Sequence, residues 1–196
     1  MKLTTAITTL LFFAPTQARM LARKRGSKDA VSTLDSDEEA EVLFLREEEK
    51  VARDVYITLG GIWNEQVFAN IAQSEQRHMD SMLEMINLYG LEDPASPVVG
   101  EFKNVDLQDM YDGLVARGQQ SLLEALHVGA FIEEVDIKDL EDAVDETDEA
   151  MLDVVYENLM EGSYNHLRAF VSRITSLGIT YDAQSLTQEE VDAILN

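Results

Sequence analysis

The chain has 196 residues, enough for one domain with a sizeable core. With 15 Lys and Arg against 38 Asp and Glu, its formal net charge of -23 repels phosphate backbones and anionic lipids, so we expect no nucleic-acid partner. No cysteine occurs, which excludes disulfides, zinc ribbons and iron–sulfur clusters and leaves oxygen and imidazole as metal ligands. Only 3 Pro and 10 Gly argue against a turn-rich β protein and favour long helices.

The first residues have the features of a targeting segment. Residues 1–18 combine Lys2, an apolar run over 10–14 and small residues at the end, as a secretory signal peptide does. The run is too short for a stable anchor, so no membrane span is expected after its removal. Residues 19–35 are expected to form a flexible linker that changes from basic to acidic. Secretion is the expectation; the alternative is a plastid protein, because residues 12–15 and the basic stretch resemble the bipartite presequences of algae with secondary plastids.

Helix start and stop signals divide residues 36–196 into six helices. Ser or Thr three residues before Glu is the spacing of a capping box, and glycine commonly ends a helix. The expected helices run from Ser36 to the pair Gly60-Gly61, from Asn64 to Gly90, from about Val105 to Arg117, from Ser121 to about Asp145, from Thr147-Asp148 to Gly178, and a short one from Thr187. No stretch alternates in strand fashion. The prediction is an all-α fold with four long helices and an extra short one between the second and third.

Each long helix carries a polar residue in the middle of its apolar stripe. On a wheel of about 100° per residue, the central residues are Glu49 on the first helix, Glu75 with His78 on the second, Glu133 with Asp136 on the third long helix, and His166 on the fourth. The neighbouring Glu47 and Glu48 are predicted to point well away, and Glu134 is displaced by one residue step. Whether Glu48 or Glu134 replaces a named ligand stays open.

Four carboxylates in one core require compensation, because one unpaired buried charge costs several kcal/mol. Two divalent cations supply +4, and two neutral imidazoles complete their coordination. We therefore predict a dinuclear metal site, with iron as the expected metal and manganese as the alternative for the same ligands. The predicted ligands are Glu49, Glu75, His78, Glu133, Asp136 and His166.

A structural alternative is a buried ion-pair cluster without metal, in which Arg53 and Arg173 neutralise part of the charge. Tyr56 is interpreted as a core tyrosine, although a phenol near the site could also be redox-active. His127 lies off its helix stripe and is expected to be solvated. Met79, Met82 and Met85 are expected to pack in the core.

Four segments carry a family resemblance. Residues 49–56 (EKVARDVY) and 70–78 (NIAQSEQRH) resemble the first two helices of the ferritin-like superfamily, closest to rubrerythrins. Residues 128–137 (VGAFIEEVDI) and 162–170 (GSYNHLRAF) are similar to a ferritin-like family labelled domain of unknown function 2202. The resemblance covers about residues 36–180. It implies an antiparallel four-helix bundle with a long crossover containing the extra short helix, a short C-terminal helix and a di-iron site.

The resemblance also implies a role for each ligand. Glu49 would be the first-helix ligand, Glu75 a bridging carboxylate, His78 and His166 terminal imidazoles, Glu133 the third-helix ligand and Asp136 the counterpart of a second acidic residue. The chain departs from the family pattern at Ser163, where rubrerythrins carry a second bridging Glu.

The expected function is that of a redox-active di-iron protein, of ferroxidase or peroxidase type. Its partners would be metal ions, dioxygen or peroxide, and an external electron donor, because the cysteine-held iron of rubrerythrins has no counterpart here. The alternatives are a non-catalytic metal-binding or storage protein and an apo structural bundle. A homodimer is left open.

Overall fold

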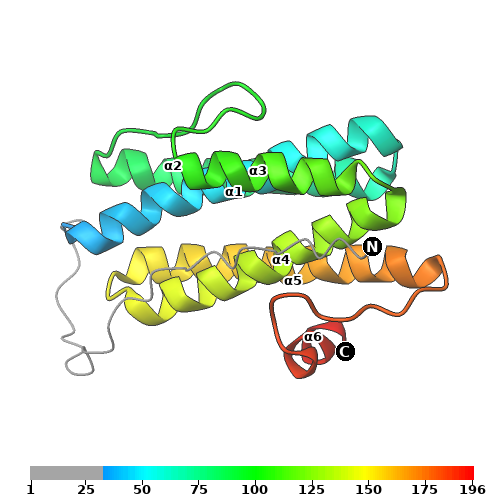
Figure 1. The fold of residues 1–196 in the computed structure, drawn as a ribbon. Helices are drawn as coiled ribbons and strands as arrows, with labels where there is room; N and C mark the ends of the chain where they lie inside the picture. Colours follow the sequence, from blue (N-terminus) through cyan, green and yellow to red (C-terminus); the bar gives the residue numbers. More distant parts are fainter. Residues whose placement is uncertain (1–32) are drawn as a thin grey trace, which may run out of the picture.

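Six helices and no strand make up the part of the chain that the computed structural model describes, residues 33–196 (Figure 1). The helices are α1 Ser36–Trp63, α2 Gln66–Tyr89, α3 Val105–Gly118, α4 Leu122–Glu146, α5 Ala150–Ser176 and α6 Gln188–Leu195. The predicted all-α class is therefore confirmed. The predicted signal peptide, residues 1–18, and residues 19–32 of the predicted linker lie outside the described residues.

Several helix ends follow the predicted signals. Gly90 ends α2 in the left-handed conformation at φ 73°, where a residue with Cβ is strained. Ser121 caps α4 by accepting a hydrogen bond from the Glu124 amide, and Thr187 forms a capping box with Glu190 at α6.

The two ends of α1 differ from the prediction. Asp35, not Ser36, is the N-cap and forms the capping box with Glu38. The helix also continues through Gly60-Gly61 to Trp63, since Asn64 takes the left-handed capping conformation at φ 53°. Gly60 serves helix packing instead, because a Cβ there would lie 3.1 Å from Cβ of Phe68 on α2. The predicted start of α5 is displaced as well: Glu149, rather than Thr147-Asp148, caps the helix.

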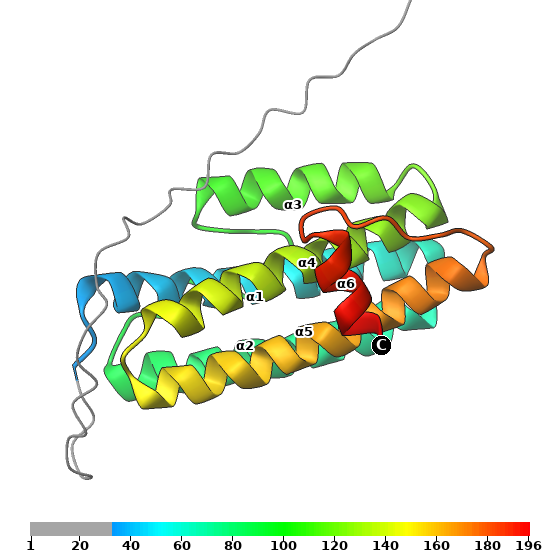
Figure 2. The same cartoon turned by 90° about the horizontal axis from the view of Figure 1, so that it is seen from below.

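The helices pack as two pairs. Short connections join α1 to α2 and α4 to α5, and the members of each pair pack along their length. Contacts of α1 with α4 and of α2 with α5 bring the pairs together, with the four long helices side by side (Figures 1 and 2). The shorter α3 lies outside them, against α1 and α4, and α6 crosses near α5 (Figure 2). None of the helices in residues 33–196 is long and apolar enough to cross a membrane.

The core consists of aliphatic side chains with an aromatic centre. Tyr56, Phe68 and Phe170 are fully buried, with ring centroids 5.2–6.1 Å apart. Gly129 makes this packing fit, because a Cβ at that position would approach Phe170 to 2.4 Å. The predicted core methionines are confirmed: Met79, Met82 and Met85 are all buried.

The connection from α2 to α3 is fixed to α1 by buried charges. Lys50 is fully buried, pairs with Asp54 and donates to the Val98 carbonyl at 2.9 Å. A further hydrogen bond, which the Gly100 amide donates to the Asp54 carboxylate at 2.9 Å, holds the same loop. Glu47 accepts from the Lys103 amide at 3.0 Å. Glu47, which the sequence predicts to point well away from the apolar stripe of α1, is buried because this connection covers it.

Candidate metal centre

The six predicted ligands are all buried, and they come from four helices. Glu49 lies on α1, Glu75 and His78 on α2, Glu133 and Asp136 on α4, and His166 on α5. The three glutamates are at most 1% exposed and the histidines 6–8%. The sequence periodicity therefore placed these polar groups in the interior correctly.

Glu75 lies at the centre of the cluster. Its Oε2 is 2.8 Å from Nδ1 of His78, and its Oε1 is 2.8 Å from Nδ1 of His166. One ligand atom from each of these three residues lies within 4.8 Å of the others, a spacing that a metal ion can span. A single carboxylate thus faces one imidazole with each oxygen.

Two outer carboxylates extend the cluster symmetrically. Oε2 of Glu49 is 3.2 Å from Nδ1 of His78, and Oε2 of Glu133 is 3.3 Å from Nδ1 of His166. The two imidazole rings face each other, with centroids 5.3 Å apart and planes 28° from parallel. Each histidine therefore lies between the shared Glu75 and one carboxylate of its own.

Several atoms of the cluster lack a hydrogen bond although they are buried. These atoms are both carboxylate oxygens of Glu75, Oε1 of Glu49 and Nδ1 of His166. Nδ1 of His166 is close to two carboxylates, but the directions are not those of hydrogen bonds. Buried polar atoms almost always have a partner. Convergent oxygen and nitrogen donors without hydrogen bonds fit a cation among them.

The charges in the metal-free cluster are strongly shifted. Burial opposes the charged imidazoles, but the carboxylates of Glu49 and Glu75 raise the pKa of His78 to about 12. Glu133 and Glu75 likewise overcome burial and raise the pKa of His166 to about 10. Burial raises the pKa of Glu75, but both histidines outweigh it and lower the value to about 2. Without metal, two imidazolium ions therefore compensate the carboxylates.

Asp136 lies at the edge of the cluster and contacts the serine that departs from the family pattern. The Ser163 hydroxyl donates to Oδ2 of Asp136. Burial raises the pKa of Asp136 well above its usual value, and the charges of Glu49 and Glu133 raise it further. Asp136 from α4 thus meets Ser163 of α5 in the interior.

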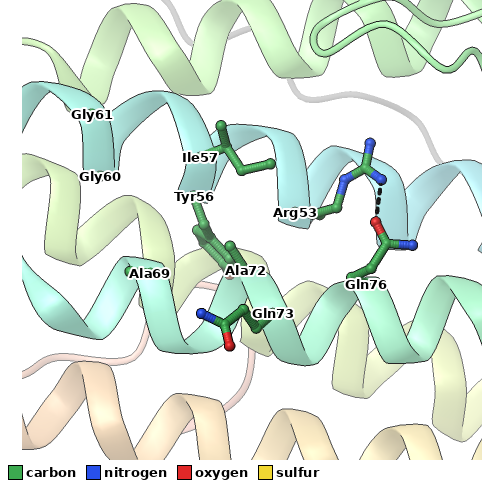
Figure 3. A pocket seen from close by; sticks show the side chains of 9 residues that line it. All are labelled: Arg53, Tyr56, Ile57, Gly60, Gly61, Ala69, Ala72, Gln73 and Gln76. Atoms are coloured by element: carbon green, nitrogen blue, oxygen red, sulfur yellow. Dashed lines mark hydrogen bonds between the residues drawn. The ribbon is translucent and has the colours of Figure 1, made fainter.

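Tyr56 contacts the cluster from the aromatic side. Its hydroxyl donates to Oε1 of Glu133 at 2.5 Å. The sequence prediction of a core tyrosine is confirmed by its complete burial, and the hydrogen bond adds an orienting role. Tyr56 also lines a groove of about 410 Å³ between α1 and α2, closed at one end by Arg53 and Gln76 (Figure 3).

Arg53 and Arg173 do not neutralise the cluster. Arg53 bonds Asp54 and Gln76, and Arg173 bonds Glu65 at 2.7 and 3.0 Å. Neither guanidinium group contacts a carboxylate of the cluster, because each is bonded to partners outside it.

Two further side chains differ from the sequence interpretation. Glu134 is fully buried away from the cluster, where Tyr181 and the amides of residues 184–186 donate to it. It therefore holds the segment before α6 and replaces none of the predicted ligands. His127 is only partly solvated, since it stacks on Tyr181 at 5.6 Å.

Glu48, which the sequence predicts to point well away from the apolar stripe of α1, is buried. It is 5% exposed, and neither carboxylate oxygen has a hydrogen bond. The stripe of α1 misses it because Glu48 lies where α1, α3 and α4 meet, and no local periodicity reports the positions of those helices.

His78 is positioned by a glycine on the facing helix. A Cβ on Gly162 would lie 2.4 Å from Nε2 and 2.6 Å from Cε1 of His78. We expect Gly162→Ala to displace the imidazole and to destabilise the protein by about 1–3 kcal/mol, as overpacking does. Denaturant unfolding with and without Mn²⁺ measures both effects.

The control for this glycine is Gly113→Ala on α3. A Cβ there meets nothing within 4 Å, so the change should be stabilising by about 0.5–1 kcal/mol through helix propensity and leave Mn²⁺ binding unchanged. Equal Mn²⁺ affinity in the two variants and the wild type would contradict a role of Gly162 in placing His78.

The fold and the cluster define a class: an all-helical protein with a buried, helix-borne group of carboxylates and imidazoles. The chain belongs to the family described as an uncharacterized protein domain (DUF2202), which matches residues 38–196. It is 45% identical over 163 residues to the uncharacterized protein MJ0754 of Methanocaldococcus jannaschii, covering 82% of this chain and 88% of the relative. The crystal structure of that hypothetical protein, from Methanococcus jannaschii, matches with a TM-score of 0.83 at 42% identity over 86% of this chain and 97% of the other.

Proposed function

We propose that the chain is a ferritin-like protein whose four long helices form a bundle around a dinuclear metal centre, with α3 in the crossover between its halves. The observation that carries the proposal is Glu75, whose two buried oxygens each face a different histidine and have no hydrogen bond. A bridging carboxylate between two metal ions needs this arrangement.

The ligand assignment follows the geometry. Glu49 and His78 would hold one ion and Glu133 and His166 the other, with Glu75 shared. Asp136 would add the fourth carboxylate, oriented by Ser163. Oxygen and imidazole ligands suit iron and also manganese. When bound, two ferrous ions supply electrons for the reduction of dioxygen or peroxide.

The surrounding residues perform the remaining tasks. Tyr56 holds Glu133 through its hydroxyl and forms part of the groove wall in Figure 3, so the groove offers a small oxidant an approach toward the centre. Burial of all six ligands excludes bulk water. Because the chain has no cysteine, the electrons that restore the reduced state come from an external donor.

Aerobic addition of ferrous ion to the metal-free protein tests this function. We expect two irons to bind per chain. We also expect near-ultraviolet absorption from ferric ion, and this absorption should appear within the mixing time and depend on His166. His127→Ala, a histidine outside the cluster, serves as the control. Two bound irons that stay ferrous in air and in peroxide would contradict redox activity and favour the storage alternative, and no bound iron would contradict both.

A further inference from the structure

A second group of buried carboxylates lies beside the proposed centre, between α1 and α4. Glu48 on α1 has both oxygens buried and without a hydrogen bond. Asp139 on α4 is its direct neighbour and also has one buried oxygen, Oδ2, without a partner. Asp136, one helical turn before Asp139, adds its charge to Glu48. These three residues are called the lateral acidic group below.

A small cavity adjoins this group. It has a volume of about 10 Å³ and lies where α1, α3 and α4 meet, with Glu48 and Asp136 as its only charged lining residues. This is about the space that one water molecule requires. The remaining lining is apolar, from Val51, Met110, Leu114, Phe131, Ile132 and Val135. An apolar wall offers no hydrogen bonds to the carboxylates.

The described residues provide no buried positive charge for the lateral acidic group. Apart from the two histidines of the proposed centre, the buried cationic side chains of residues 33–196 are Lys50 and Arg46, and both are engaged elsewhere: Lys50 with Asp54, and Arg46 with Asp93 and the Met79 carbonyl. Two divalent ions at the proposed centre would balance its four carboxylates and leave buried Glu48 without a positive partner, while half-buried Asp139 has only the exposed Lys138 near it. Burial of an unbalanced carboxylate is unfavourable by several kcal/mol.

We propose that Glu48 and Asp139, together with Asp136, bind a third divalent cation at the α1–α4 interface. The ligands are carboxylate oxygens only, so the site would take a hard cation such as Mn²⁺, Mg²⁺ or Fe²⁺. It would not favour metals that prefer imidazole ligands. Asp136 connects this site to the proposed dinuclear centre. The half-buried Glu41 lies two helical turns before Glu48 on α1, and burial together with the nearby charge of Asp139 raises its pKa to about 7.

The competing explanation is a shared proton between Glu48 and Asp139. Burial and then Asp139 raise the pKa of Glu48 well above its usual value, so a protonated Glu48 could donate to Asp139 without any metal. The two explanations differ in what glutamine does. Glu48→Gln keeps a donor for Asp139 but removes the anionic ligand, so it preserves a proton-type contact and destroys a metal site.

Equilibrium dialysis against Mn²⁺ under anaerobic conditions, with elemental analysis, counts the ions. We expect the wild type to bind about three Mn²⁺ per chain and Glu48→Gln one fewer. Glu47→Gln is the matched control, because Glu47 is an adjacent buried glutamate that accepts an amide hydrogen bond which glutamine can also accept. Asp139→Asn, on the half-exposed side, provides a second variant if Glu48→Gln does not fold.

The outcomes separate this proposal from the dinuclear one. A count that Glu75→Gln lowers, but that neither Glu48→Gln nor Asp139→Asn changes, would overturn the third site and leave the centre intact. A loss of one ion in Glu48→Gln or Asp139→Asn, with wild-type binding in Glu47→Gln, supports the third site even if the ferrous test of the centre fails.

Discussion

Glu75→Gln is expected to abolish metal binding at the proposed centre. Each oxygen of Glu75 lies 2.8 Å from a different histidine nitrogen, so one substitution removes a ligand from both ions. Loss of a residue that only orients a ligand typically weakens metal binding 10- to 100-fold. We expect at least about 100-fold for a ligand shared by two ions. Isothermal titration with Mn²⁺ measures the change.

The control and the stability of this variant make the result specific. Glu84→Gln lies on the same helix but is exposed, so its Mn²⁺ affinity should equal that of the wild type. Circular dichroism establishes that Glu75→Gln remains helical. If folded Glu75→Gln loses one ion and keeps the other at wild-type affinity, Glu75 does not bridge.

The metal-free protein is expected to lose stability as pH rises from about 5 to 8. Burial raises the pKa of Glu41 and of Glu49 to about 7, above the usual 4.5. The folded state therefore binds more protons than the unfolded state between these values, and its stability falls with increasing pH. A single carboxyl whose pKa is raised from 4.5 to about 7 in the folded state accounts for about 3 kcal/mol.

The histidines act in the same direction at higher pH. In the folded state the pKa of His166 is about 10 and that of His78 about 12, both above the usual 6.5. Their contribution to the stability of the folded state is therefore complete below pH 6.5 and is lost as pH rises through these two values. Glu75 opposes this trend only in acid, because its lowered pKa of about 2 removes stability as pH falls through that value. Metal binding requires neutral imidazole, so Mn²⁺ affinity should instead increase with pH.

Urea unfolding in the presence of a chelator, at several pH values, measures the stability trend. Glu41→Gln removes one titrating group outside the proposed centre and should flatten it. A metal-free protein whose stability increases from pH 5 to 8 would contradict the arrangement of buried carboxylates. Mn²⁺ titrations at the same pH values should show tighter binding at the higher ones.

The helices could be predicted because their signals are local. Ser121 and Thr187 cap helices as expected, and Gly90 ends one. The observed ends of α1 differ from the predicted ones for two reasons. At its start, Asp35 and Ser36 are neighbouring candidates for the cap. At its end, Asn64 terminates the helix, while Gly60 packs against Phe68. Local signals do not distinguish a glycine that ends a helix from one that allows close packing.

The sequence by itself determined that Glu49, Glu75, His78, Glu133, Asp136 and His166 lie in the interior, because each lies in the middle of the apolar stripe of its helix. Helical periodicity is sufficient for that conclusion, since it needs no knowledge of neighbouring helices. The tertiary structure alone decided that Glu75 faces both histidines, that Arg53 and Arg173 stay apart from them, and that Glu48 is buried where α1, α3 and α4 meet. These contacts join residues far apart in the chain, and their geometry depends on how the helices pack against one another.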